Sequence, residues 1–129
     1  MTFLRPATLA EIAGIRLCPT TGQYVPALEA TAADAAPFGL YRLEVADIPT
    51  SAHVPSGVMR NEPVKHATLC RLLLGHREWP RPIVLRREAS GSLTRLDGDH
   101  RSSAALDLHA RGLLTADVRL LAFVGPEAT

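Results

Sequence analysis

The chain has 129 residues, of which 47% are hydrophobic and 21% are charged, and its formal net charge is +1. This length is enough for one compact domain and too short for two, and the composition is that of a globular protein rather than a disordered tail. The near-neutral charge argues against a surface that binds duplex DNA by itself, because such domains usually carry a larger basic excess.

Membrane, secreted and metal-centred proteins are also disfavoured by the sequence. The first residues lack the apolar stretch of a signal peptide, and no run approaches the ~20 apolar residues that a membrane span needs. The two cysteines, Cys18 and Cys70, are too few for a disulfide framework. Closely spaced metal ligands are not evident either. We therefore expect a cytoplasmic protein with no membrane segment and no metal centre.

Residues 1–38 predict an extension that precedes the main domain. Thr8 and Glu11 have the spacing of a capping box, which marks the start of a helix. That helix would present one apolar face, made of Leu9, Ile12, Ala13 and Leu17. Residues 27–36 have high helix propensity but weak amphipathicity. We expect the extension to contribute one helix that packs against the domain formed by residues 39–129.

Residues 40–75 predict a strand, a loop and a helix. Apolar and polar residues alternate over residues 40–45, as in a half-buried strand. Residues 48–57 are rich in turn formers. A helix is expected to begin near Glu62 and Pro63, since proline suits the first helical turn, and to end near Gly75. Its core-facing side would consist of Val64, Leu69, Leu72 and Leu73.

The remaining residues predict a hairpin, a second helix and a last strand. Strands at residues 82–86 and 93–96 would pair across a turn at residues 89–92. A sharp loop then leads into a helix over residues 100–111, which buries Ala104, Ala105 and Leu108. Gly112 would end this helix. The last strand, residues 117–123, would place Val118, Leu120 and Ala122 on one face. Together these elements predict an α+β fold with a small mixed sheet and packed helices.

Several polar and aromatic residues are interpreted as structural rather than functional. His66 and His76 are expected on the surface, and Trp79 is expected to be a hydrophobic anchor. Cys70 falls within an apolar helix and is interpreted as a core residue. The arginines around the hairpin, which include Arg81, Arg86, Arg87 and Arg95, predict a solvated basic face.

The junction between the second hairpin strand and the following helix is the main candidate for a binding site. A helix that begins directly after a strand presents unpartnered amides and the positive end of its dipole, which together favour an anion. Gly98 would let the backbone approach a ligand closely, and Arg101 can hold a phosphate in a bidentate fork. A second interpretation stays open, because Asp-Gly is a common turn and Asp99 would then act only as an N-cap.

The same region resembles a known family. A Pro-Ile-Val strand at residues 82–84 is followed by a hairpin and by Asp-Gly-Asp-His-Arg at residues 97–101, ahead of an Ala-rich helix, and this order is similar to that of ParB-type domains. The similarity extends to the predicted strand and helix upstream and to the last strand, so it covers roughly the last two thirds of the chain. It implies a ParB/sulfiredoxin-like fold with a nucleotide or phosphate pocket at the turn.

The resemblance also implies roles for individual residues. Sulfiredoxins carry a cysteine at the position of Asp99, so the aspartate argues against sulfiredoxin chemistry. Their phosphate-contacting His-Arg pair corresponds to His100 and Arg101. A lysine and a hydroxyl residue on the family's helix correspond to Lys65 and Thr68, which are three residues apart and share one helix face.

Catalysis, if present, would depend on two carboxylates. In free-serine kinases of this superfamily, acidic residues bind or deprotonate the substrate hydroxyl. Asp97 matches one of these residues, and Glu62 is a less secure match for the other. The implied nucleotide-binding residues are Lys65, Thr68, Gly98, Asp99, His100 and Arg101, and no residue is assigned to a metal ion.

Two functions from different classes therefore remain open. One is a small-molecule kinase or nucleotide hydrolase that uses ATP, ADP or CTP, with or without Mg²⁺, and a small hydroxyl-bearing substrate. The other is a non-catalytic regulatory module that binds a nucleotide and acts with a separate DNA-binding partner. A nuclease ranks last, and a homodimer is compatible with either function.

Overall fold

The computed structural model describes residues 1–8, 11, 38–50 and 63–127, and for residues 96, 97, 126 and 127 it describes the backbone alone. In chain order, the described elements are β1 (Thr2–Pro6), β2 (Gly39–Leu43), the 3-10 helix η2 (Val45–Asp47), α3 (Pro63–His76), β3 (Ile83–Arg87), β4 (Leu93–Asp97), α4 (Asp99–Ala110) and β5 (Leu120–Glu127).

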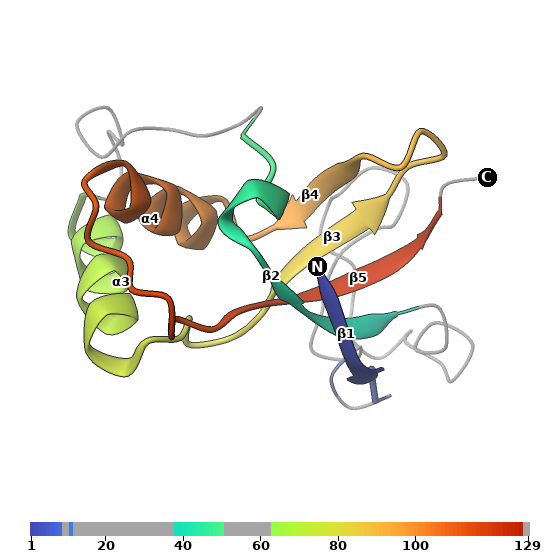
Figure 1. Ribbon diagram of the computed structural model, residues 1–129, viewed down its shortest axis with the longest axis horizontal. Coiled ribbons are helices and arrows are strands. Elements are labelled where there is room, and N and C mark those ends of the chain that lie inside the picture. The colour runs from blue at the N-terminus through green and yellow to red at the C-terminus, as the bar shows by residue number, and fades with distance from the viewer. Residues whose placement is uncertain (9–10, 12–37, 51–62, 128–129) are drawn as a thin grey trace.

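The described strands form one mixed sheet in the order β1-β2-β5-β3-β4 (Figure 1). The β3–β5 pair is parallel, and the other three pairs are antiparallel. The chain's last strand thus lies in the middle of the sheet. Its residues Leu120 to Val124 are all buried, and a continuous apolar run is typical of a strand that is covered on both faces. The predicted α+β class with a mixed sheet and packed helices is confirmed.

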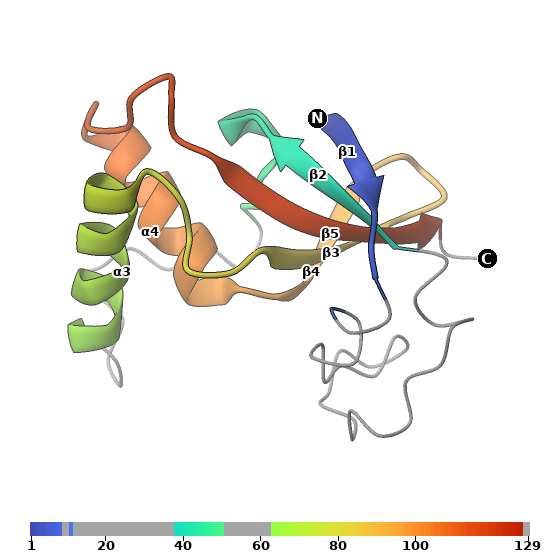
Figure 2. The same ribbon diagram turned by 90° about the horizontal axis from the view of Figure 1, so that it is seen from below.

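Helices α3 and α4 lie together on one side of the sheet (Figures 1 and 2). The main core fills the space between them and the sheet, and it includes Leu73 of α3, Leu108 of α4, and Ile83, Leu120 and Ala122 of the sheet. A smaller apolar cluster of Leu40, Leu121 and Phe123 lies on the opposite face, because alternate residues of a strand point to opposite faces. None of the described helices is long and apolar enough to cross a membrane.

Most element predictions are confirmed, with shifts at the ends. The helix expected from Pro63 to Gly75 is α3, the hairpin is β3–β4, and Ala104, Ala105 and Leu108 are buried as predicted. The first predicted strand stops at Leu43, because Val45 enters η2. The last strand starts three residues later than predicted, at Leu120.

The predicted core face of α3 is wrong at one position. Val64 is 76% exposed, whereas His66, which was expected on the surface, is only 4% exposed. Leu69 and Leu73 set the buried face of α3, and His66 continues that face at a spacing of three and seven residues. Val64 lies five residues before Leu69, which turns it roughly 140° away from the buried face.

The N-terminal segment contributes a strand that the sequence pattern did not predict. β1 pairs antiparallel with β2, and Phe3 packs edge-on against Tyr41 with ring centroids 5.3 Å apart. The capping box is confirmed: Thr8 N donates to Glu11 Oε1 at 2.9 Å, and Glu11 N donates to Thr8 Oγ1 at 3.3 Å. The helix predicted to follow it lies outside the described residues.

Candidate functional site

The helix α4 begins directly after the turn that follows β4. Gly98 is the N-cap residue, with φ 109° and ψ 32°, and as a glycine it has no side chain that could cap the helix. The first helical hydrogen bond is donated by Ser102 N to Gly98 O at 2.8 Å. The amides of the three residues in between therefore lack helical partners, as the sequence pattern predicted. Asp99 is the first helical residue, so its interpretation as an N-cap is wrong.

Gly98 is required by the fold as well as by the turn. Its φ lies in the left-handed region, which strains residues that have a side chain. A Cβ atom at this position would also collide with Cγ2 of Ile83 in the core. The absent Cβ thus makes room for β3, a role that the sequence pattern did not indicate when it assigned Gly98 to close ligand approach.

Asp99 forms an ion pair with Arg95 across the turn. Arg95 Nε lies 2.6 Å from Asp99 Oδ1, and Arg95 Nη1 donates to Pro49 O at 3.1 Å. The Arg95 side chain is only 3% exposed, although its partner Asp99 is 69% exposed. Arg95 was expected to lie on a solvated face of the hairpin, and that expectation is wrong. Its burial follows from its place opposite Leu85 on the core-facing side of the sheet.

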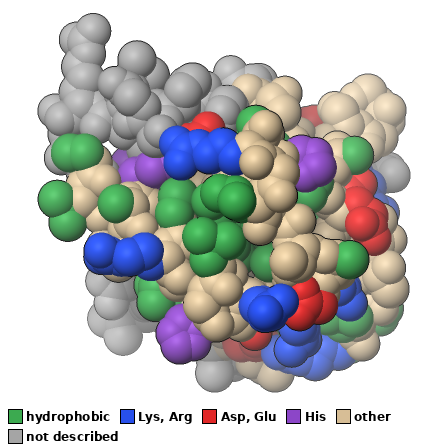
Figure 3. Space-filling model, turned by 60° about the vertical axis from the view of Figure 1, so that its left-hand side comes forward, with side chains coloured by type: hydrophobic (Ala, Val, Ile, Leu, Met, Phe, Trp, Pro, Cys, Tyr) green, Lys and Arg blue, Asp and Glu red, His purple; other side chains and the backbone are tan. Residues whose placement is uncertain are grey.

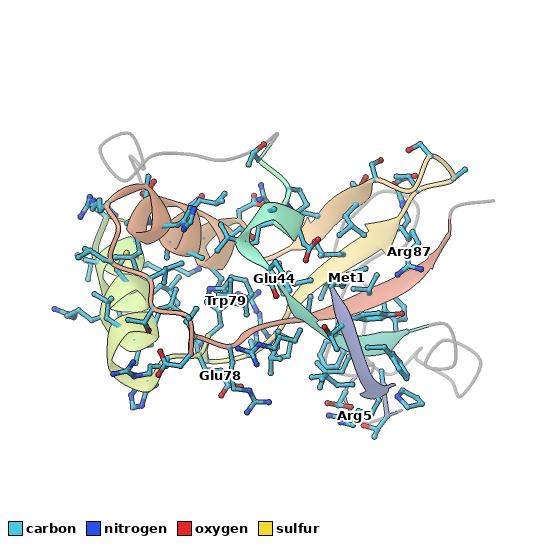
Figure 4. The ribbon with its side chains drawn as sticks, in the orientation of Figure 1. Met1, Arg5, Glu44, Glu78, Trp79 and Arg87 are labelled. Carbon is cyan, nitrogen blue, oxygen red and sulfur yellow. The ribbon has the colours of Figure 1, made fainter. Side chains whose placement is uncertain are left out.

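Arg101 is a buried anchor at the start of α4. Its Nη1 donates to Arg81 O at 3.1 Å and to Pro82 O at 2.7 Å, so it ties α4 to the segment that enters β3. Its own carbonyl accepts a hydrogen bond of 2.9 Å from Trp79 Nε1. Trp79 lies between the helices and the sheet, which confirms its role as a hydrophobic anchor (Figure 4). Arg101 therefore brings positive charge to the turn, but Nη1 of its guanidinium is used to hold α4 against the segment before β3.

The other predicted binding residues lie on α3 or beside the turn. His100 is half-buried in the first turn of α4. Lys65 is exposed in the first turn of α3, and Thr68 Oγ1 accepts a hydrogen bond of 3.4 Å from Arg71 Nη2. Arg95 contacts Asp99, and Arg101 contacts the segment before β3. Lys65 and Thr68 take part in neither of these contacts. The first turn of α3, which contains Lys65, lies against the second half of α4, where His66 meets Asp107.

The two predicted catalytic carboxylates are Asp97 and Glu62. Asp97 ends β4, where its backbone is paired with that of Val84, but its side chain lies outside the described atoms. Glu62 lies outside the described residues. The strand-turn-helix order around Asp97 is nevertheless the one predicted.

A buried histidine between the two helices was not predicted from the sequence. His66 Nε2 lies 3.0 Å from Asp107 Oδ2, so the first turn of α3 meets the second half of α4. Cys70, one turn further along α3, is half-buried and packs against the core. Its burial, followed by the negative charge of Asp107, raises the pKa of the Cys70 thiol. This thiol is thereby kept protonated, which is the opposite of an activated nucleophile.

The helix-bearing side exposes apolar as well as basic side chains (Figure 3). Among the described residues, the exposed large hydrophobic residues of this region include Val64 and Leu74 of α3, and Leu113. No group of three or more His, Cys, Asp and Glu side chains in the described ranges could hold a metal ion. A comparison with protein-family models finds no match, and comparisons with curated proteins and with solved structures find none either.

Proposed function

We propose that this protein is a nucleotide-binding domain of the ParB/sulfiredoxin-like type, which holds the nucleotide phosphates at the start of α4. The order of the elements from β2 to β5 agrees with what the sequence resemblance implies: strand, helix, hairpin, helix and strand. The turn that the resemblance assigns to phosphate joins β4 to α4 in this fold.

The strand-turn-helix junction at Gly98, with the start of α4 directly after it, is the observation that carries the proposal. The positive end of the helix dipole at this turn favours an anion. The acidic side chain in this first turn, Asp99, is matched by the charge of Arg95. Arg101 lies two residues after Asp99 and adds a second guanidinium, whose Nη1 is held by two backbone carbonyls. The backbone and these two cations together favour a phosphate at the turn.

The start of α3 supports the same interpretation. Its first turn contains Lys65 and no acidic residue. A cation in the first turn of a helix is disfavoured by the helix dipole, and a bound anion would reverse that penalty. The first turn of α3 meets the second half of α4, through His66 and Asp107, so Lys65 would reach an anion from the side of α4 rather than from its start. We assign Lys65 and Thr68 to the distal phosphates on the basis of the sequence resemblance.

Nucleotide binding is better supported than catalysis. Binding rests on the backbone and cations of the described residues, whereas catalysis rests on Asp97 and Glu62, whose side chains the structure does not describe. The conclusion is therefore a binding domain. It is consistent with a regulatory module, and phosphate transfer or hydrolysis is the second candidate function.

Calorimetric titration of the full chain with ATP, ADP and CTP, with and without Mg²⁺, tests this function. Lys65→Gln should weaken binding about tenfold, since it removes a charge-assisted contact, whereas Arg119→Gln, a control at an exposed arginine, should not. Arg101→Ala is a poorer test, because it also removes two hydrogen bonds that hold the fold.

A phosphate-release assay tests catalysis. The protein would be established as an enzyme if the wild type releases phosphate and Asp97→Asn binds nucleotide but releases none. A wild type that binds no nucleotide at millimolar concentration would refute the proposal.

A further inference from the structure

Arg95 differs from an ordinary surface arginine in how its charge is paired. In the ion pair between Arg77 and Asp117, both side chains are exposed, at 52% and 59%. In the pair between Arg95 and Asp99, the cation is buried and the anion is open to solvent. A buried guanidinium needs a partner, because an unpaired charge inside a protein is strongly destabilising. An exposed carboxylate, in contrast, can be rehydrated at little cost.

The position of Arg95 directs this charge at the proposed phosphate site. Arg95 lies on the core-facing side of the edge strand β4, two residues before the end of that strand. Its Nε reaches the first residue of α4, and its Nη1 is fixed by Pro49 O. The guanidinium is thus held in place before any ligand arrives, so little side-chain entropy remains to be lost on binding.

We propose that Arg95 is the main anion-binding side chain of this turn and that the Asp99 carboxylate is its built-in competitor, which a phosphate group displaces. This inference rests on the proposed function and extends it to regulation of the same site. A phosphate group carries up to two negative charges and has a geometry that suits the guanidinium, so it replaces a single carboxylate favourably. Arg101 is less available for this role, because its Nη1 is already bonded to two carbonyls.

The decisive variant is Asp99→Asn, which removes the competing charge at an exposed position and keeps the shape of the side chain. Calorimetric titration with pyrophosphate, and separately with ATP, should give a dissociation constant about tenfold lower than that of the wild type. The matched control is Asp117→Asn, which removes a carboxylate from the exposed pair with Arg77 and should leave both affinities unchanged. The pyrophosphate and ATP titrations show whether phosphate alone suffices or the nucleoside is needed.

A thermal measurement gives a second and independent readout. Without ligand, Asp99→Asn should melt at a lower temperature than the wild type, because Arg95 loses its partner. Saturating pyrophosphate should then raise the melting temperature of Asp99→Asn more than that of the wild type. Arg95→Lys, which keeps the charge but removes the Nε hydrogen bond, should bind pyrophosphate more weakly in either background.

The outcomes separate this inference from the proposed function. Equal affinities of the wild type and Asp99→Asn would overturn the competitor role while leaving nucleotide binding intact. Binding by Asp99→Asn alone would overturn both proposals, because phosphate would then fail to displace the carboxylate in the wild type. If neither protein binds pyrophosphate or ATP at millimolar concentration, both the inference and the proposed function are wrong.

Discussion

At the scale of single residues, Gly98 shows how one position can serve both the fold and a site. The left-handed backbone at Gly98 turns the chain from β4 into α4, and the missing Cβ lets the turn approach Ile83. The Asp-Gly pair in the sequence predicts the turn, because glycine is favoured where φ is positive. The contact with Ile83 could not be predicted, since it depends on how β3 lies beside the turn in three dimensions.

Gly98→Ala should destabilise the protein by roughly 2–5 kcal/mol, the sum of left-handed backbone strain and overpacking against Ile83. Gly91→Ala is the matched control. Gly91 also has a positive φ, of 88°, but a Cβ there would meet no atom within 4 Å. It should cost only about 1–2 kcal/mol. Urea denaturation of the two variants measures the difference, and equal destabilisation would show that the contact with Ile83 does not matter.

The burial of Arg95 and His66 could not be predicted from the type of each residue alone. Arginine and histidine are mostly found at the surface or half-buried, so composition alone places them outside. Arg95 is buried because its strand position faces the core and because Asp99 and Pro49 supply partners. His66 is buried because it continues the face of α3 set by Leu69 and Leu73 and meets an aspartate of α4. Both causes lie partly in other elements, which the local sequence does not specify.

At the scale of elements, the N-terminal capping box is linked to β1 by an ion pair. Arg5 at the end of β1 donates from Nη1 and Nη2 to the two carboxylate oxygens of Glu11, each at 2.7 Å. This pairing, helped by the bond from Thr8 N, lowers the pKa of Glu11 to about 2 from its usual value of 4.5. The spacing of Thr8 and Glu11 predicted the capping box, but Arg5 precedes it and could not be assigned to Glu11 from the pattern.

The lowered pKa of Glu11 predicts a pH dependence of stability. Because the pKa is lower in the folded state, the stabilisation from this carboxylate is present above about pH 4.5 and is lost as the pH falls toward about 2. The difference in unfolding free energy between the wild type and Glu11→Gln should therefore shrink over this range. Denaturant titrations at several pH values across it measure the change. A difference that does not vary with pH would show that Glu11 is not ionised against Arg5 in solution.

At the scale of the whole molecule, the order of the strands in the sheet could not be predicted from the sequence pattern. Hydrophobic alternation and turn residues predicted the hairpin of β3 and β4, because adjacent strands joined by a short turn pair locally. The parallel pairing of β3 with β5 and the antiparallel pairing of β2 with β5 join distant parts of the chain. β1 has no apolar core face, since all five of its residues are exposed, so no burial pattern marked it as a strand.

This topology predicts that the two ends of the chain contribute unequally to folding. A chain that begins at Ala7 lacks the edge strand β1, including the packing of Phe3 on Tyr41, but keeps the sheet from β2 to β4. It should fold with a lower urea midpoint and expose the edge of β2. A chain that ends at Arg119 lacks β5, which pairs with both β2 and β3 and supplies Leu120, Ala122 and Val124 to the main core.

The chain that ends at Arg119 should show no cooperative unfolding, because removing β5 splits the sheet in two and leaves the helices without the centre of their core. Circular dichroism during urea titration distinguishes the two truncated chains. The aromatic pair that β1 forms with β2 is worth only about 0.5–1.5 kcal/mol beyond its buried area, so the chain without β1 should retain a sigmoidal transition. A sigmoidal transition of the chain without β5 at a similar midpoint would contradict the central role of β5, and an unchanged midpoint of the chain without β1 would show that β1 adds nothing to stability.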